Sequence, residues 1–524
     1  MHGFKGRSRA LVLASLGAIA MALVLAAAGP ASTKRSAANA TCKKQYGTLS
    51  YGIAGNGIPA LDPNSISSAA QWVLQPLVFP GLVELQADGS VAPSLATKWK
   101  HSDDLKTWWF WLRHDAKYSD GRAFTSADAV QNILRVLDPK IPSQARANVK
   151  DFRSVRAINK YEIRIKLGSP SAIVPDQLLL VRMSDLTDPT KLNTVGNGTG
   201  PYKVSNFVPD QSLTLVPNPY YSGPTPPCFK RVAVIREPDP TAMTTDFTSG
   251  KLGVVWQVPI ANVPKLESDG HAFIVAPKAV SSVQAWELDT KSPPFDNPLA
   301  RQALSYAVDR ATMVKVAYQG QARPSLTNDL LSTASAGYDK ALKPYTFNLQ
   351  KAKQLFQQAG VKPGTTFTFW AQADKNPERI TMAEILQQDL AKIGYKLNIV
   401  QNDTSTWLQK FYPAGKSYPG LIVANGLSLQ PNPALGLSFG ISGKCECNWN
   451  NKQYDALYLK ALGTPDPVKR QVVYNQMQQL FSQQVPVLTI GHLTNVMAAQ
   501  KGIVGIWEDP RGNAHLENAH FAGH

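Results

Sequence analysis

Three glycines alternate within residues 195–207, which read VGNGTGPYKVSNF, and glycine-rich loops of this kind can hold phosphate groups. A phosphate loop, however, joins a strand to the N-terminus of a helix and usually carries a Lys-Ser or Lys-Thr pair. Here Pro201 follows the last glycine, apolar residues then alternate up to Phe207, and a strand-like run, SLTLV, occupies 212–216. The stretch therefore predicts a loop that leads into a β-hairpin rather than a nucleotide site.

A second pattern with catalytic potential is GLSFG at residues 436–440, which has the G-x-S-x-G form of a serine-hydrolase motif. A nucleophile elbow needs a strand before the serine and a helix after it. Pro431 and Pro433 precede Ser438, and the loop-like sequence ISGKCEC follows it. These neighbours indicate a loop. The chain is therefore predicted not to be an enzyme, and an exported serine hydrolase is kept as the alternative.

Four cysteines, Cys42, Cys228, Cys445 and Cys447, follow the N-terminal region. An exported chain, which the N-terminus predicts below, reaches an oxidising compartment in which disulfides persist. Four cysteines allow three pairings. The Cys-Glu-Cys triplet could also suggest a metal, but no second such motif and no nearby histidine in the sequence completes a ligand set. No metal and no other cofactor is therefore predicted.

The C-terminal stretch RGNAHLENAHFAGH brings His515, His520 and His524 close together in sequence. Histidines at this spacing can bind a metal, whereas chain ends more often fray and leave such residues solvated. A frayed end is the expectation. Metal binding by these histidines is the alternative. A receptor for a metal chelate is the kind of metal-binding protein that suits the fold considered below.

Length and composition limit the class of protein. The chain has 524 residues, 44% of them apolar and 17% charged, an ordinary globular profile that allows two to four domains. Its 54 Lys and Arg residues against 37 Asp and Glu residues give a formal charge of +17, but the basic residues are dispersed. A nucleic-acid binder normally concentrates them on one element. The sequence therefore predicts a solvated basic surface and no nucleic-acid partner.

The N-terminal segment has the form of an export signal. Residues 1–9 are polar and basic, residues 10–29 form an uncharged apolar run, and Ala38-Asn39-Ala40 is an A-x-A cleavage pattern. An uncleaved anchor is the alternative, because the apolar run is long enough to span a bilayer. No second run of this kind occurs, so the chain is not predicted to be a channel or permease. We expect an exported protein that is periplasmic or attached to a cell surface.

Strand-like runs dominate the first half of the chain. They occupy residues 49–53, 107–113, 161–167, 212–216 and 232–236. The run at 107–113 is the richest in aromatic residues, and its tryptophans point to both faces at strand period. It is therefore predicted to be a strand covered on both sides. A stacking platform for bases would need an accompanying basic groove, which the sequence does not indicate.

Helical signals are clearest in the second half, where Asn297 and Asn348 stand at cap positions. The predicted helices span 126–137, 298–319, 349–359, 381–393 and 468–481. Strand-like runs at 366–370 and 396–400 lie between the later helices. This alternation of helix and strand predicts an α/β protein.

Five stretches together carry a family pattern. Their sequences are GLVELQADGSVAPSLATKWKHSDDLKTWWFWLRHDAKYSDGRAFTSADAV (81–130), GTGPYKV with the later NPYY, RQALSYAVDR (301–310), NLQKAKQLFQQAG (348–360) and WNNKQYDALYLKAL with the later KRQVVYNQMQQLFSQQVPVL. In this order, over nearly the whole chain after the leader, they resemble the peptide/nickel-type family 5 solute-binding proteins of ABC importers. By this resemblance the glycines near Gly198 form a crossing loop between domains.

The resemblance implies an α/β fold with two lobes and a hinge of two strand crossings, the class II periplasmic-binding-protein-like fold of three domains. The expected parts are a signal peptide or anchor at 1–40, lobe I at 45–75, 197–282 and 488–524, an inserted extra domain at 76–196, and lobe II at 283–487. Closure of the lobes would exclude water from a captured solute and give a permease two states to distinguish. Resemblance to dipeptide binders also implies that Cys42 pairs with Cys228, which leaves Cys445 and Cys447 to form a tight ring.

The chain departs from the family pattern in one segment. Dipeptide and oligopeptide members carry a G-W-x-x-D-x-x-D-P segment whose acidic residue holds the α-ammonium group of the peptide. The corresponding residues 425–433 read NGLSLQPNP. Gly426 then stands at the Trp position, Leu429 at the ammonium-binding position and Asn432 at the later Asp position. This segment contains no carboxylate, so a free peptide N-terminus would lose its main anchor.

Other residues offer substitutes. Asp403 or Asp374 is the alternative partner for an ammonium group. Dipeptide members place an arginine for the ligand carboxylate in the loop after the position of Trp370, where this chain offers Lys375 or Arg379. The predicted ligand-contacting residues are Asn64, Ser67, Gln71, Trp370, Lys375, Asn425, Gly426, Leu427 and Leu429.

The predicted function is that of an extracytoplasmic receptor that captures a peptide or peptide-like solute between two closing lobes and delivers it to an ABC permease. A monomer is expected. A modified peptide, a sugar-like solute or a metal chelate is the alternative, because each suits the uncharged segment at 425–433 at least as well.

Overall fold

The computed structural model describes most of the chain after residue 41. The described residues are 42, 45–53, 57–65, 69–224, 226–259, 262–274, 282–318, 322–333, 335–372, 378–411, 416, 418–423, 427–428, 432–493, 496–509 and 513–522. The predicted leader at 1–40 lies outside them. No helix within these ranges is both long and apolar enough to cross a membrane.

One seven-stranded sheet gathers strands from three distant parts of the chain, in the order β12-β20-β11-β1-β10-β9-β8. Its strands are β1 Tyr46–Ile53, β8 Tyr202–Val208, β9 Ser212–Pro217, β10 Phe229–Arg236, β11 Val254–Trp256, β12 Ala272–Ile274 and β20 Met497–Ala499. β1 runs parallel to both β10 and β11. In β9 buried Leu213 and Leu215 alternate with more exposed residues, the period-2 pattern of a strand with one core face.

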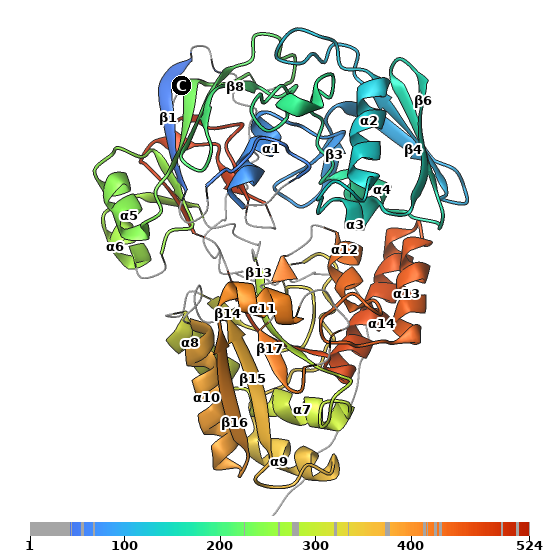
Figure 1. Cartoon of the computed structure of the whole chain (residues 1–524), viewed down its shortest axis with the longest axis vertical. Helices are drawn as coiled ribbons and strands as arrows, with labels where there is room; N and C mark the ends of the chain where they lie inside the picture. Colours follow the sequence, from blue (N-terminus) through green and yellow to red (C-terminus); the bar gives the residue numbers. More distant parts are fainter. Residues whose placement is uncertain are drawn as a thin grey trace, which may run out of the picture. The chain divides into compact units, whose positions relative to one another are not determined.

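The two faces of this sheet bury separate cores. One face packs Tyr51 and Leu215 with residues such as Phe229. On the other face, Val255 of β11 packs in one cluster with Met243 and Leu266, which belong to two short helices, α5 Pro240–Thr248 and α6 Val263–Ser268 (Figure 1). Asp239 caps α5 by accepting hydrogen bonds from backbone N–H groups of its first turn.

The chain between β1 and β8 forms a four-stranded antiparallel sheet, in the order β4-β5-β7-β6, with a helix against it (Figure 1). The elements are β4 Ala96–His101, β5 Thr107–Leu112, α2 Ser126–Leu137, β6 Phe152–Asn159 and β7 Glu162–Leu167. Thr125 and Asp128 form a capping box at the start of α2, the helix that the sequence predicts at 126–137. Trp108 and Phe110 of β5 lie in the core with Ile133 of α2.

The expectation that β5 is covered on both sides holds for one face only. Trp109 and Trp111 point away from the core and are half-buried, and lysine side chains of β4 lie over their rings. Among the described residues, helices pack against the core face of this sheet, and long polar side chains cover the second face.

A second sheet of seven strands has the order β14-β19-β13-β17-β15-β16, and β18 also pairs with β13. Its strands are β13 Ser282–Leu288, β14 Ala322–Pro324, β15 Thr366–Gln372, β16 Lys396–Asn402, β17 Leu421–Val423, β18 Leu427–Ser428 and β19 Val487–Leu493. Trp286 and Phe369 meet edge to face in its core, with ring centres 5.0 Å apart. On the other face Val283 packs with Met477 and Phe481 of a long C-terminal helix.

The helices of this part are α7 Pro298–Ala307, α8 Arg310–Ala317, α9 Leu349–Gln358, α10 Glu378–Lys392, α11 Thr404–Phe411, α12 Pro433–Leu437, α13 Lys452–Leu462 and α14 Pro467–Gln484. Two of them, α7 and α9, begin at the predicted caps Asn297 and Asn348. The single helix predicted at 298–319 is wrong. Val308 is extended, and the Asp309 side chain accepts a hydrogen bond from the Thr312 N–H group, which starts a new helix, α8.

The chain passes between the two large sheets twice, from β12 to β13 and from β19 to β20. This gives the two-lobed α/β fold. The smaller elements are η1 Ala69–Val73, α1 Leu74–Leu77, β2 Val83–Leu85, β3 Val91–Pro93, α3 Arg146–Val149, α4 Val174–Leu178, η2 Pro189–Lys191, η4 Ser438–Gly440, β21 Ile503–Val504, β22 Trp507–Glu508, β23 Ala514–His515 and β24 His520–Phe521. The domain boundaries given above stay predictions.

Candidate functional site

The carboxyl ends of parallel strands are where open α/β sheets bind their ligands. In the second sheet β15 runs parallel to β16 and β17, and in the first sheet β1 runs parallel to β10 and β11. The side chains at these two carboxyl edges are therefore the candidates for ligand contact.

At the carboxyl edge of the second sheet, a buried arginine follows β15. Arg379 lies in the first turn of α10, is 5% exposed, and donates from Nη1 to Oε1 of Gln372 at 2.6 Å. Tyr318 adds its hydroxyl group, which donates to Oε1 of Gln284 at 3.3 Å. Burial, with the neighbouring Glu378 carboxylate, raises the pKa of Tyr318, so this hydroxyl stays neutral. The edge thus combines a guanidinium group with neutral hydrogen-bonding groups.

Trp370 lies on the same strand. Its indole Nε1 donates to the Pro419 carbonyl oxygen at 3.3 Å, and Lys410 Nζ of α11 lies 3.5 Å from the ring centre. The ring also packs with Phe411. Trp370 is therefore held by a hydrogen bond and a cation–π contact at the carboxyl edge.

The predicted residues of the first lobe are buried and use their amides on the protein backbone. The Asn64 amide donates to the Arg182 carbonyl oxygen at 2.8 Å and accepts from the Arg182 N–H group at 3.0 Å. Gln71 donates to the Ala60 carbonyl oxygen at 2.9 Å. These contacts fix the loops after β1, and a role in ligand contact stays a prediction.

Several predicted contact residues fall outside the described residues, namely Ser67, Lys375, Asn425, Gly426 and Leu429. Leu427 is described only as part of the backbone of β18, opposite Val283.

Of the two acidic residues named as substitutes for the lost ammonium partner, Asp374 lies outside the described residues. Asp403 is described and acts as a helix cap. Its carboxylate accepts from the Thr406 N–H group at 2.9 Å and from the Thr406 hydroxyl at 2.6 Å. These hydrogen bonds lower the pKa of Asp403.

The carboxyl edge of the first sheet holds a cluster that sequence reasoning missed. His515 is buried, stacks on Trp507 with ring centres 3.8 Å apart, and lies 3.1 Å from a carboxylate oxygen of Glu517. Its Nε2 lies 3.7 Å from Asp509. Although burial opposes the charged form, Glu517 and Asp509 together raise the pKa of His515 to about 9. The expectation of a frayed, solvated end is therefore wrong for His515, and His524 lies outside the described residues.

Glu508 completes this cluster. Burial and, to a lesser extent, the neighbouring Asp509 carboxylate raise the pKa of Glu508 to about 9. A hydrogen bond with Trp256, at the end of β11, acts in the opposite direction and lowers this pKa. Glu508 is therefore neutral near pH 7, while His515 is charged. The residues of this cluster read WED at 507–509 and HLE at 515–517, and these short patterns do not predict that the cluster forms. Trp256 joins the cluster from a distant part of the chain.

A buried histidine also lies on β19. His492 stands opposite Val283 and Arg323 in the sheet. Burial, with the nearby Arg323 charge, lowers the pKa of His492 to about 4, so its imidazole is neutral near pH 7.

The glycines of the loop at 195–200 allow close contact between backbone segments, and a crossing between domains at this loop stays a prediction. A side chain at Gly198 would lie 1.9 Å from the Val78 carbonyl oxygen, and one at Gly200 would lie 2.3 Å from the Leu77 carbonyl oxygen. The Gly200 N–H group donates to the Val78 carbonyl oxygen at 3.0 Å. The glycines therefore serve packing rather than a phosphate.

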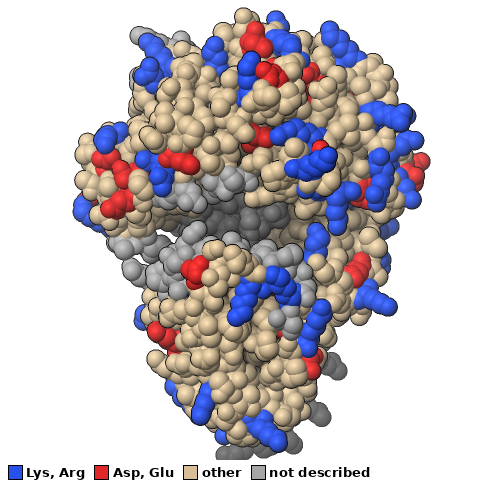
Figure 2. Space-filling view, in the orientation of Figure 1, with Lys and Arg blue, Asp and Glu red and all other residues tan. Residues whose placement is uncertain are grey.

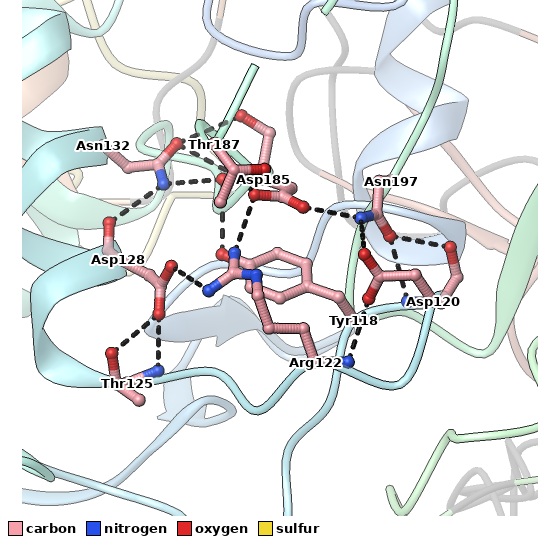
Figure 3. A network of polar contacts seen from close by, with 11 residues as sticks. Tyr118, Asp120, Arg122, Thr125, Asp128, Asn132, Asp185, Thr187 and Asn197 are labelled. Atoms are coloured by element: carbon pink, nitrogen blue, oxygen red, sulfur yellow. Dashed lines mark hydrogen bonds and ion pairs between the residues drawn. The ribbon is translucent and has the colours of Figure 1, made fainter. Parts of the chain in front are cut away.

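Polar contacts hold this loop against the inserted region (Figure 3). Arg122 bridges Asp128 of α2 and Asp185, at 2.7 Å to each carboxylate, and its guanidinium group lies over the Tyr118 ring. Asn197 of the loop donates to the other oxygen of Asp185 at 2.7 Å. The network ties the loop to α2, which explains why its residues are polar without invoking a ligand.

Ser438 does not have the surroundings of a catalytic serine. It follows α12 directly, so a helix rather than a strand precedes it, and its hydroxyl donates to the Leu435 carbonyl oxygen at 2.7 Å. The geometry removes the support for the hydrolase alternative.

Both cysteine pairs form disulfides. Cys42 is joined to Cys228, as the resemblance implied, and Cys445 is joined to Cys447. Ligand atoms of Glu287 and the second pair lie within 4.8 Å of one another. Burial and the nearby Glu446 carboxylate raise the pKa of Glu287 well above its usual range, which disfavours the carboxylate form that binds metals. Both sulfurs are joined in the disulfide, so this group of atoms is a poor metal site in this form.

The comparisons with known proteins agree with this fold. The model of the bacterial extracellular solute-binding proteins, family 5, matches residues 90–435. The chain is 28% identical over 474 residues to heme-binding protein A of Haemophilus influenzae, covering 83% of this chain and 85% of that protein. It is 25% identical over 492 residues to the dipeptide-binding protein of Pseudomonas aeruginosa, covering 87% and 91%. The solved structure of NikA from Brucella suis with Fe(III)-EDTA has a TM-score of 0.79 at 21% identity, covering 91% of this chain and 100% of that chain.

The chain therefore belongs to the family 5 bacterial extracellular solute-binding proteins. Members of this family are periplasmic or extracellular, bind a peptide or another small solute without catalysis, and work with an ABC permease. The chain is accordingly the solute-binding receptor of an ABC importer.

Proposed function

We propose that the receptor captures a peptide or peptide-like solute that carries a carboxylate, and that its two lobes close around this solute. The observation that carries the proposal is the buried guanidinium group of Arg379 beside Gln372. Guanidinium groups bind carboxylates through two parallel hydrogen bonds, and burial strengthens this pairing. The position supports the proposal, because ligands of α/β sheets bind at the carboxyl edge.

The amino end of the solute is expected to be recognised differently. Asp403 already caps α11 and is exposed, so it is a poor anchor for a buried ammonium group. This favours a solute whose amino end is blocked, modified or held by neutral groups. A non-peptide chelate remains the alternative, which the names of the heme-binding relative and of the NikA–Fe(III)-EDTA structure keep in view.

The first experiment is native mass spectrometry of the protein purified without denaturation, followed by identification of the released solute. We expect the mass of a carboxylate-bearing peptide or peptide derivative. Calorimetric titration then measures the affinity of this solute for the wild-type protein and for the variants Arg379→Gln and Arg379→Lys. Removing one partner of a buried charge pair typically costs several kcal/mol, so Arg379→Gln should weaken binding roughly 30-fold or more.

Arg231→Gln is the matched control, because Arg231 is exposed on β10 and its change removes the same charge. Thermal unfolding of each variant separates a lost contact from a lost fold. Unchanged affinity in a folded Arg379→Gln variant, or a released solute without a carboxylate, would refute the role of Arg379.

The proposal further includes an exported, monomeric receptor without a catalytic step and without a nucleic-acid partner. The absence of any long run of basic residues in the sequence, and the hydrogen-bonded hydroxyl of Ser438, support these parts. Light scattering of the purified chain, with and without solute, measures the oligomeric state.

A further inference from the structure

The four-stranded sheet of the inserted region has two chemically different faces. Core residues of β5 alternate with residues that point outward, and residues paired across neighbouring strands share a face. The cross-strand pairs therefore identify the outward face. They place Lys98 opposite Trp111, Lys100 opposite Trp109, and Arg164 on the other side of Trp109.

Two further cations complete this face. Lys166 stands opposite Thr107, and Arg156 of the edge strand β6 stands opposite Arg164. The outward residues thus include Lys98, Lys100, Arg156, Arg164 and Lys166, which we call the basic face. The only acid that the same pairing places there is Glu162, which accepts a hydrogen bond from Asn159.

The basic face is not neutralised by acids in the described part of the chain. None of its five cations forms an ion pair with a described residue, whereas nearby Arg113 and Arg122 both do. Apart from Glu162, the acids nearest in sequence to Lys98 and Lys100 are Asp103 and Asp104, which lie in the turn after β4 rather than on a strand. Figure 2 shows several Lys and Arg side chains along the flank of the molecule where Figure 1 labels β4 and β6.

Tryptophan rings lie directly beneath the lysines. Lys98 Nζ is 5.2 Å from the centre of the Trp111 ring, and Lys100 Nζ is 5.3 Å from that of Trp109. Both rings are half-buried. Each lysine therefore covers apolar surface with its stem and presents its ammonium group to solvent, the arrangement that suits a boundary between water and an apolar phase.

We propose that the basic face docks on an anionic phospholipid bilayer. Its cations come from three strands, β4, β6 and β7, and do not follow one line, which matches a two-dimensional array of headgroup phosphates better than a single polymer chain. Clustered Lys and Arg residues bind anionic lipid surfaces, and tryptophan is favoured at the headgroup level. A polymer that stacks on aromatic rings would find both rings covered by lysines.

The test is co-sedimentation of the full mature chain with vesicles of phosphatidylcholine alone, or of phosphatidylcholine mixed with phosphatidylglycerol. Binding is expected only to the anionic vesicles, and it should weaken as salt screens the charges. A variant with Lys98, Lys100, Arg156 and Lys166 changed to Gln should bind at least a hundredfold more weakly, since each cation contributes roughly fivefold.

A matched control removes four charges elsewhere. Lys343, Lys353, Lys362 and Lys396 are exposed and form no ion pair with a described residue. Their change to Gln should leave vesicle binding near the wild-type level. Thermal unfolding and solute binding show that both variants are folded.

Three outcomes would overturn the proposal. The first is equal binding, or none, to the two kinds of vesicle. The second is equal loss in the two variants, which would reduce the effect to net charge. The third is binding to a soluble polyanion such as dextran sulfate without binding to anionic vesicles, which would assign the basic face to a polymer.

Discussion

The surroundings of two side chains beside the first sheet shift their pKa values upward, for different reasons. The pKa of Glu508 is raised to about 9, chiefly by burial, and that of His515 is raised to about 9 by its carboxylate neighbours against the effect of burial. The ordinary values are 4.5 and 6.5. The folded chain therefore holds protons that the unfolded chain has released over most of the neutral range.

This difference predicts a loss of stability at alkaline pH. The stabilisation is complete below the unfolded pKa values and is lost as pH rises from 4.5 to about 9 for Glu508, and from 6.5 to about 9 for His515. Glu508→Gln mimics the protonated acid, so its melting temperature should fall less steeply between pH 6 and pH 9 than that of the wild type. Thermal melts across this range measure both slopes, with exposed Glu267→Gln as the control for a lost charge. Equal slopes in wild type and Glu508→Gln would contradict the assignment.

At the scale of elements, the glycine-rich loop at 195–200 depends on glycine for close backbone contact rather than for flexibility. A Cβ atom at Gly198 would overlap the Val78 carbonyl oxygen, whereas one at Gly47 on β1 would meet nothing within 4 Å. Gly198→Ala should therefore lower the free energy of unfolding by about 3 kcal/mol, and Gly47→Ala should leave it nearly unchanged. Urea unfolding compares the two. Equal stabilities would show that the loop relaxes without cost.

Local signals in the sequence predicted most elements but not their interruptions. The cap residues Asn297 and Asn348 were correctly identified, because capping depends on neighbours within one turn. The break at Asp309 was missed, since apolar periodicity continues across it and only the hydrogen bond to Thr312 reveals a new start. The outward tryptophans of β5 were misjudged, because the sequence does not show that one face lacks a second layer.

The candidate site divides in the same way. A resemblance after Trp370 pointed to Arg379, which lies only seven residues from its partner Gln372. The cluster of Glu508 and His515 could not be predicted, because burial and a distant contact with Trp256 create its chemistry. Burial that depends on contacts between distant parts of the chain cannot be predicted from composition or from the local spacing of residues.

At the scale of the whole molecule, the first disulfide ties the start of the described chain to the middle of the sequence. Cys42 and Cys228 are 186 residues apart, and Cys228 ends the loop before β10, the strand that pairs with β1. Cross-linking stabilises a protein mainly by restricting its unfolded chain, and the effect grows with the length of the closed loop. The bond therefore limits how far the unfolded chain can separate β1 from β10.

This argument predicts unequal effects for the two disulfides. Cys42→Ser with Cys228→Ser should lower the free energy of unfolding by about 3–5 kcal/mol, because a long loop is released. Cys445→Ser with Cys447→Ser opens a ring with a separation of only 2 residues and should cost much less through chain entropy. Denaturant titrations of both double variants test this, and the matched pair controls for the loss of two sulfurs. A larger loss from the second pair would mean that the small ring stabilises the native loop around Glu287 itself, and that packing at this site outweighs chain connectivity.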